Sequence, residues 1–165
     1  MNRIAVLCGT GMSTFSKSLS SMVESRSELM FAESEWGEVP IKVVSTASGV
    51  VFVIDRHHSS GDSRTPPHAI EHRANVHAAL SCNPDLIVSI NSVGSMIQNM
   101  PPGTIGVGGG LLDLSEKPWS FHDVDAFHSD RTNPFNSYYS DLCVETLAKK
   151  QGSTPSGVVV AQCVG

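Results

Sequence analysis

The sequence predicts an α/β fold with a mixed, largely parallel central sheet flanked by helices. Short apolar runs that end at glycine or polar residues alternate with longer segments of helical pattern, as in α/β proteins. Residues 86–90 are almost continuously apolar, which is typical of a strand covered on both faces. The 165 residues suffice for a sizeable core, so we expect one domain over residues 1–165.

The first half of the chain is predicted to hold three strands and a helix. Residues 4–8 form an apolar run before a glycine-rich turn and indicate the first strand, whereas the serine-rich residues 12–27 indicate a loop with an irregular helix. Residues 41–45 and 50–54 flank a short turn and predict a hairpin. Residues 69–81 follow two prolines and predict a helix.

The second half is predicted to continue this alternation. Residues 86–90 follow an Asn-Pro-Asp turn and predict a strand, and residues 104–107 indicate another, although three glycines after it weaken the pattern. Residues 138–150 predict a second helix and residues 158–161 a last strand.

Composition excludes several classes of protein. The formal net charge of −5 counts against a general nucleic-acid binder, and no apolar run has the length of a membrane span or the form of a signal peptide. The four cysteines form no Cys-x-x-Cys pair, which favours buried thiols in a reducing compartment. We therefore expect a cytoplasmic protein without nucleic-acid or membrane partners.

Three loops that follow predicted strands carry groups suited to an anion. Gly9-Thr10-Gly11 offers backbone N–H groups and a hydroxyl, and Arg56-His57 offers a guanidinium fork and an imidazole. Asn91-Ser92 adds a hydroxyl and a further N–H. Ligands of open α/β sheets bind beyond the carboxyl ends of the strands, so these loops predict a phosphate site.

Two other kinds of site have less support. His68 and His72 are four residues apart and could share a metal on one helix, but no His-Glu-x-x-His pattern or obvious third ligand accompanies them. We predict no metal, and a metal-dependent hydrolase using His57 with these two histidines is kept as an alternative. A serine hydrolase lacks its Gly-x-Ser-x-Gly elbow.

The motifs together resemble the trimeric-type purine nucleoside phosphorylases and 5′-methylthioadenosine phosphorylases. Arg56-His57 resembles the family's Arg-His-Gly, and Pro66-Pro67-His68 with Arg73-Ala74-Asn75 resembles its Pro-Pro-His…Tyr-Arg-Ala-Asn. Supporting matches are Cys8-Gly9-Thr10-Gly11, Trp36-Gly37, Ser92-Val93-Gly94-Ser95, Pro102-Gly103-Thr104, and His128 with Pro134-Phe135. The resemblance implies a nucleoside phosphorylase-like fold.

The resemblance implies phosphorolysis of a purine nucleoside, giving free purine and (5-methylthio)ribose 1-phosphate in purine and methylthioadenosine salvage. Thr10, Arg56, His57, Asn91 and Ser92 would then bind phosphate. His128 would reach the 5′ end of the substrate in a neighbouring subunit, and we expect a homotrimer. The only co-substrate implied is inorganic phosphate, with no cofactor.

The sequence departs from the family pattern at several places. Cys8 stands for a glycine, His58 for the glycine after Arg-His, and Glu35, Glu38 and Val39 alter the Thr-Pro-Phe-Gly segment. The family's Gly-Pro-x-Phe-Glu segment, purine pocket and general acid would lie beyond Gly165, so we expect the N-terminal portion of such a domain and assign no catalytic residue. The alternative function is a non-catalytic phosphate-binding or oligomerisation module.

Overall fold

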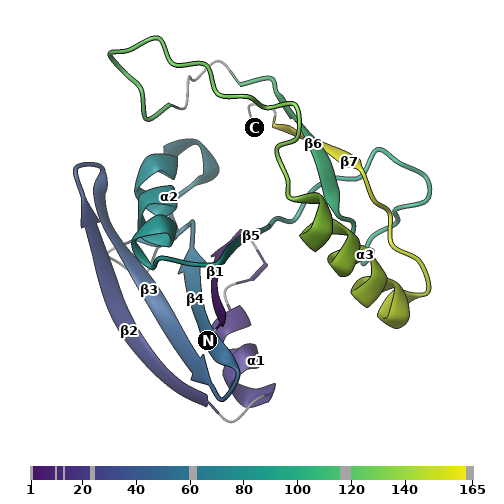
Figure 1. Ribbon diagram of the computed structural model, residues 1–165, viewed down its shortest axis with the longest axis horizontal. Coiled ribbons are helices and arrows are strands. Elements are labelled where there is room, and N and C mark those ends of the chain that lie inside the picture. Colours follow the sequence, from purple (N-terminus) through teal and green to yellow (C-terminus); the bar gives the residue numbers. More distant parts are fainter. Residues whose placement is uncertain are drawn as a thin grey trace. The chain divides into compact units, whose positions relative to one another are not determined.

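The computed structural model describes residues 2–9, 11–12, 14–22, 25–59, 63–115 and 120–162. It divides into two units, Met1–Ser92 and Val93–Gly165, each with its own sheet (Figure 1). Each unit combines its sheet with at least one helix, so the α/β class with a mixed sheet is confirmed. The single domain over residues 1–165 stays a prediction.

The first unit is a five-stranded mixed sheet in the order β2-β3-β4-β1-β5. β1 lies between β4 and β5 and is parallel to both, whereas β2, β3 and β4 form an antiparallel meander. The strands are β1 (Asn2–Cys8), β2 (Ser25–Ser34), β3 (Gly37–Thr46), β4 (Gly49–Asp55) and β5 (Leu86–Ile90), and the helices are α1 (Phe15–Met22), η1 (Pro67–Ala69) and α2 (His72–Ser81).

Alternating side chains of this sheet enter two apolar clusters on its opposite faces. On one face, α2 packs against all four of β1 to β4, and the cluster contains Leu7, Ile41, Ile54 and Ala78 (Figure 1). On the other face, Val6, Cys8 and Val53 pack with Met12 and Phe15, the latter at the start of α1. The sheet is therefore covered on both sides near the carboxyl ends of β1 and β4.

The second unit contains the parallel pair β6 (Gly108–Asp113) and β7 (Val158–Gln162), connected through α3 (Ser137–Gln151). The Asn136 side chain accepts a hydrogen bond from the Tyr139 N–H and caps the start of α3, which ends at Gly152 with a φ of 83°.

Most of the predicted elements are confirmed, with three differences. The strand β2 was not predicted, because most of its residues are polar or charged and its one apolar run, residues 29–32, is short and mostly exposed. The strand predicted at residues 104–107 is wrong, since the strand is Gly108–Asp113 and includes the glycines. A Cβ at Gly109 would lie 2.5 Å from the Gly157 Cα, so glycine permits this close backbone approach. The strand β5 was predicted to be covered on both faces, but its residues alternate between half-buried and exposed.

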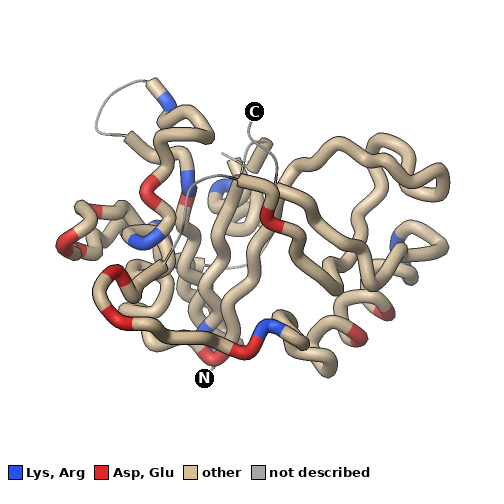
Figure 2. The backbone as a smooth tube through the Cα atoms, turned by 90° about the horizontal axis from the view of Figure 1, so that it is seen from above, with Lys and Arg blue, Asp and Glu red and all other residues tan. Residues whose placement is uncertain are grey.

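Charged residues of both signs are spread along the described backbone. Lys and Arg residues are interspersed with Asp and Glu along the described backbone rather than gathered in one stretch (Figure 2). Within the described residues, no helix combines the length and apolar character that crossing a membrane requires.

The first prediction concerns the core on the α2 face. Ile41 is fully buried among β3, β4 and α2, so Ile41→Ala leaves a cavity and should lower the free energy of unfolding by about 2–5 kcal/mol. Met22 is 81% exposed at the end of α1, so Met22→Ala should change it by less than about 0.5 kcal/mol. Urea unfolding measures both, and equal midpoints for the two variants would contradict the assigned core.

The second prediction concerns thiol reactivity. Burial raises the pKa of the Cys8 thiol to about 11, with a smaller increase from the Asp55 carboxylate and an opposing effect of Arg56. At pH 8 only about one Cys8 in a thousand is then a thiolate. Iodoacetamide should modify the exposed Cys143 and spare Cys8 until urea is added. Peptide mapping by mass spectrometry measures this, and modification of folded Cys8 as fast as Cys143 would show that the assigned burial is wrong.

Candidate functional site

The carboxyl ends of β1, β4 and β5 meet at one edge of the first sheet. Cys8 is in register with Asp55 on one side and with Ile90 on the other. Beyond the strands, the Arg56 N–H donates to the Cys8 carbonyl oxygen at 3.0 Å, and the Gly9 N–H donates to the Ile90 carbonyl oxygen at 2.9 Å. The predicted convergence of the three loops is therefore present in the backbone itself.

Two glycines make room for side chains of the neighbouring loops. A Cβ at Gly9 would lie 2.5 Å from Arg56 Nη2 and 3.5 Å from Asn91 Oδ1, so the guanidinium lies directly over the Gly9 backbone. A Cβ at Gly11 would lie 3.3 Å from Ser92 Oγ, and Gly11 has a φ of +86°, which favours glycine. Thr10, the predicted hydroxyl donor between them, lies outside the described residues.

Arg56 is a half-buried cation whose guanidinium has no acidic partner among the described residues. Its Nε is shielded from solvent and has no hydrogen-bond partner in the described part of the chain. Burial lowers the pKa of Arg56, and the nearby Asp55 carboxylate acts in the opposite direction with a smaller effect. A desolvated cation with unused donors attracts an anion, and its planar fork matches phosphate oxygens.

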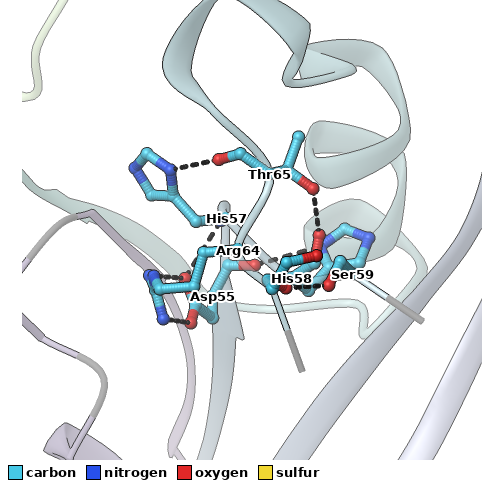
Figure 3. A network of polar contacts seen from close by, with 7 residues as sticks. Asp55, His57, His58, Ser59, Arg64 and Thr65 are labelled. Atoms are coloured by element: carbon cyan, nitrogen blue, oxygen red, sulfur yellow. Dashed lines mark hydrogen bonds and ion pairs between the residues drawn. The ribbon is translucent and has the colours of Figure 1, made fainter. Parts of the chain in front are cut away.

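The carboxylate closest to Arg56 in sequence is engaged elsewhere. Asp55 accepts hydrogen bonds from Arg64 Nη1 at 2.7 Å and from Arg64 Nη2 at 2.8 Å, one to each carboxylate oxygen (Figure 3). Its Oδ1 also accepts from the His57 N–H at 3.0 Å. The basic loop predicted from the sequence thus contains one arginine that neutralises Asp55 and another that faces the glycine loop.

His57 is held in place by its contacts with Thr65. The His57 side chain is buried, and its Nδ1 lies 2.8 Å from the Thr65 carbonyl oxygen, while the Thr65 N–H donates to the His57 carbonyl oxygen at 3.0 Å (Figure 3). Because a carbonyl oxygen only accepts, Nδ1 carries the hydrogen. Donation from Nε2 to an anion then requires the protonated imidazolium.

The Asn91 and Ser92 side chains lie at the end of β5. Asn91 Nδ2 donates to Ser89 Oγ at 3.2 Å, which leaves Oδ1 on the side of Gly9 and Arg56. Rotation of the amide exchanges these two atoms, since the Ser89 hydroxyl serves as donor or acceptor. Asn91 is thus able to present a donor to an anion at this edge.

The remaining predicted histidines are placed differently. His128 is exposed in the second unit, between β6 and α3 in the sequence, whereas the predicted phosphate-binding residues belong to the first unit. His68 is in η1 and His72 begins α2, so the two histidines do not share one helix. Proline at positions 66 and 67 favours the short turn, and the Glu71 side chain accepts from the Arg73 N–H to begin α2. No three His, Cys, Asp or Glu residues of the described chain are grouped as metal ligands.

The pocket and contacts around Arg56 could not be predicted from the sequence. A pocket of about 140 Å³ lies beside Arg56 and is also lined by Trp36, Glu71 and Asn75. The Trp36 ring lies 5.6 Å from the Arg73 guanidinium carbon, which joins the β2–β3 turn to the start of α2. The Asp55–Arg64 pair spans nine positions of a loop, and such spacing has no periodic signal from which it could have been predicted.

Comparison with known proteins gives relatives of one kind. No protein-family model matches the chain. It is 30% identical over 144 residues to the 6-oxopurine nucleoside phosphorylase of Pyrococcus furiosus, covering 82% of this chain and 51% of that protein. It is also 30% identical over 134 residues to the probable S-methyl-5′-thioinosine phosphorylase of Methanothermobacter thermautotrophicus, covering 80% and 45% respectively. The chain thus spans about half the length of these curated relatives.

Solved structures show the same fold. A methylthioadenosine phosphorylase from an Antarctic soil metagenomic library has a TM-score of 0.74 at 20% identity, over 98% of this chain and 54% of that one. The methylthioadenosine phosphorylase of Schistosoma mansoni in complex with tubercidin has a TM-score of 0.78 at 14% identity, over 100% and 64% respectively. This likeness confirms the predicted nucleoside phosphorylase-like fold. The chain is thus similar, over about half of their length, to purine nucleoside and 5′-methylthioadenosine phosphorylases.

Proposed function

We propose that the protein acts in the phosphorolysis of a purine nucleoside and that the edge formed by β1, β4 and β5 holds the inorganic phosphate. The observation that carries the proposal is the half-buried Arg56 guanidinium, which lies over Gly9 without an acidic partner among the described residues. The names of the relatives support a 6-oxopurine nucleoside or its 5′-methylthio analogue as the substrate class.

The proposed reaction replaces the bond from C1′ to the purine nitrogen with a bond from C1′ to a phosphate oxygen. The electron pair of the broken bond leaves with the base, which takes up a proton, and the sugar passes through an oxocarbenium-like transition state. A phosphate dianion held close to C1′ stabilises the positive charge that develops there. The work of the described residues is therefore positioning and electrostatics.

The predicted residues share the binding of phosphate in this proposal, and Asn91 is able to add a donor from the end of β5. Arg56 binds two phosphate oxygens through its fork, the Ser92 hydroxyl donates to another, and Gly9 and Gly11 let the backbone approach closely. The resemblance assigns a hydroxyl contact to Thr10. His57 adds a donor when its imidazole is protonated, since Nδ1–H is engaged by Thr65.

The resemblance also supports an assembly and a set of partners. We propose a homotrimer in which His128 reaches the 5′ end of a nucleoside bound by a neighbouring subunit. The reaction needs phosphate as a co-substrate and no further cofactor, because the nucleophile itself carries the charge that stabilises the transition state.

The third prediction is the activity itself. Any free base that the 165-residue protein releases from 5′-methylthioinosine, inosine, guanosine, 5′-methylthioadenosine or adenosine should appear only when phosphate is present. Release at an equal rate without phosphate would support the hydrolase alternative. Phosphate binding by calorimetry without any release would support the non-catalytic module.

The substitution Arg56→Ala tests whether phosphate binding depends on this one residue. Removing the guanidinium should weaken phosphate binding by about 10- to 100-fold, because charge-assisted hydrogen bonds are lost. Arg56→Lys should recover only part of it, since an ammonium lacks the fork. Arg26→Ala is the matched control, because it removes the same charge from an exposed pair with Glu28 on β2. Equal phosphate affinities for Arg56→Ala and Arg26→Ala would overturn the assigned site.

The fourth prediction tests the glycine that lies beneath Arg56. Gly9→Ala places a methyl group 2.5 Å from Arg56 Nη2 and 3.2 Å from the Ile90 carbonyl oxygen, so the flexible arginine must move and the backbone must shift slightly. A displaced guanidinium should lower kcat/KM by about a hundredfold. Gly108→Ala is the control, since its Cβ would meet Phe135 ring carbons no closer than 3.5 Å. Unchanged kinetics of Gly9→Ala would mean that Arg56 does not act from this position.

A further inference from the structure

The pair between Arg64 and Asp55 lies next to the proposed phosphate site without being part of it. The contact is bidentate, with both guanidinium nitrogens within 2.8 Å of a carboxylate oxygen (Figure 3). We propose that Arg64 is a positioning residue, which occupies the Asp55 carboxylate so that the Arg56 guanidinium stays available to an anion. This inference rests on the proposed function of Arg56.

The ion pair between Arg64 and Asp55 adds little to the stability of the fold. The Arg64 side chain is 44% exposed and the Asp55 side chain 31% exposed. Ion pairs with such exposure contribute little to the stability of the fold, since water solvates the separated charges well. The main effect of the pair is therefore to neutralise the Asp55 carboxylate, and its effect on the free energy of unfolding is small.

The Asp55 carboxylate is close enough to affect the proposed site. Burial lowers the pKa of Arg56 and raises that of the Cys8 thiol; Asp55 opposes the first of these effects and adds to the second, whereas Arg56 lowers the pKa of the thiol. Asp55 and Arg56 therefore share one electrostatic environment at the end of β4. Without Arg64, the carboxylate would repel an incoming phosphate and compete with it for the Arg56 guanidinium.

The pair also fixes the loop that carries His57. Asp55 Oδ1 accepts from the His57 N–H, and Thr65, the residue after Arg64, contacts His57 through both its N–H and its carbonyl oxygen. Arg64 thus holds the end of this loop against its beginning. A charge role and a loop-holding role predict different behaviour when both partners are removed.

The fifth prediction is a double-mutant cycle of Arg64→Ala, Asp55→Asn and the double variant, with calorimetric titration of inorganic phosphate. Asparagine keeps the oxygen that accepts the His57 N–H and removes the charge. Arg64→Ala should weaken phosphate binding by about tenfold, a coupling typical of residues in one charge network. The double variant should return to within about twofold of the wild type, because no free carboxylate remains.

The controls separate the two roles. Arg64→Lys should bind phosphate nearly as well as the wild type, since it restores the charge near Asp55. Arg26→Ala, with the same change in net charge, should leave the affinity unchanged. A double variant as weak as Arg64→Ala, or weaker, would overturn the charge role and identify a loop-holding contact only.

A second measurement decides the inference when phosphate binding itself fails. If the wild type binds no phosphate, the proposed function is wrong, but the crystal structure of Arg64→Ala still tests the charge competition. We expect the Asp55 carboxylate within hydrogen-bond distance of the Arg56 guanidinium in that variant. An Asp55 carboxylate turned to solvent, with Arg56 unmoved, would overturn the inference.

Discussion

The position of β1 between two parallel neighbours is the constraint on which the site depends. Parallel pairing places the carboxyl ends of β4, β1 and β5 at the same edge, so three loops that are far apart in sequence begin within hydrogen-bond distance of one another. The antiparallel meander of β2 and β3 extends the sheet on the other side of β4 and supplies Ile41 to the core under α2. The buried apolar clusters on both faces hold β1 and β4 rigid where the loops leave them.

The charge of the site follows from this arrangement. Arg56 leaves β4 beside a buried thiol and over a glycine, where water is partly excluded and its pKa is lowered. A neighbouring aspartate would ordinarily neutralise such a cation. Here the bidentate contact with Arg64 engages that aspartate, and the two arginines of the same loop consequently have opposite roles. In the proposed site, an anion completes the coordination of Arg56.

Most of the sheet could be predicted because its strands are buried and short. The runs that became β1, β4 and β5 are apolar and end at glycine or polar residues, so both their extent and the loops after them were readable. The strand β2 was not, because its short apolar run lies among polar and charged residues that resemble a loop. The strand β6 was misplaced, since a glycine that permits close approach to Gly157 reads in the sequence as a break.

For the candidate site, the residues that follow strands could be predicted, and the contacts across the loop could not. Gly9, Arg56 and Ser92 were identified because each follows a strand and has chemistry suited to an anion, and parallel pairing then brings them together without any further information. The role of Arg64 was not identifiable, because it depends on which acidic group its side chain reaches across a loop. Asp55 Oδ1 accepts hydrogen bonds from both the His57 N–H and Arg64. The backbone turn at His57 and the ion pair therefore depend on the same carboxylate oxygen. A loop of different length would preserve the motif residues and lose that contact. In the proposed site, the sequence motif therefore specifies which groups meet the anion, and the loop geometry determines whether the charge of Arg56 remains available to it.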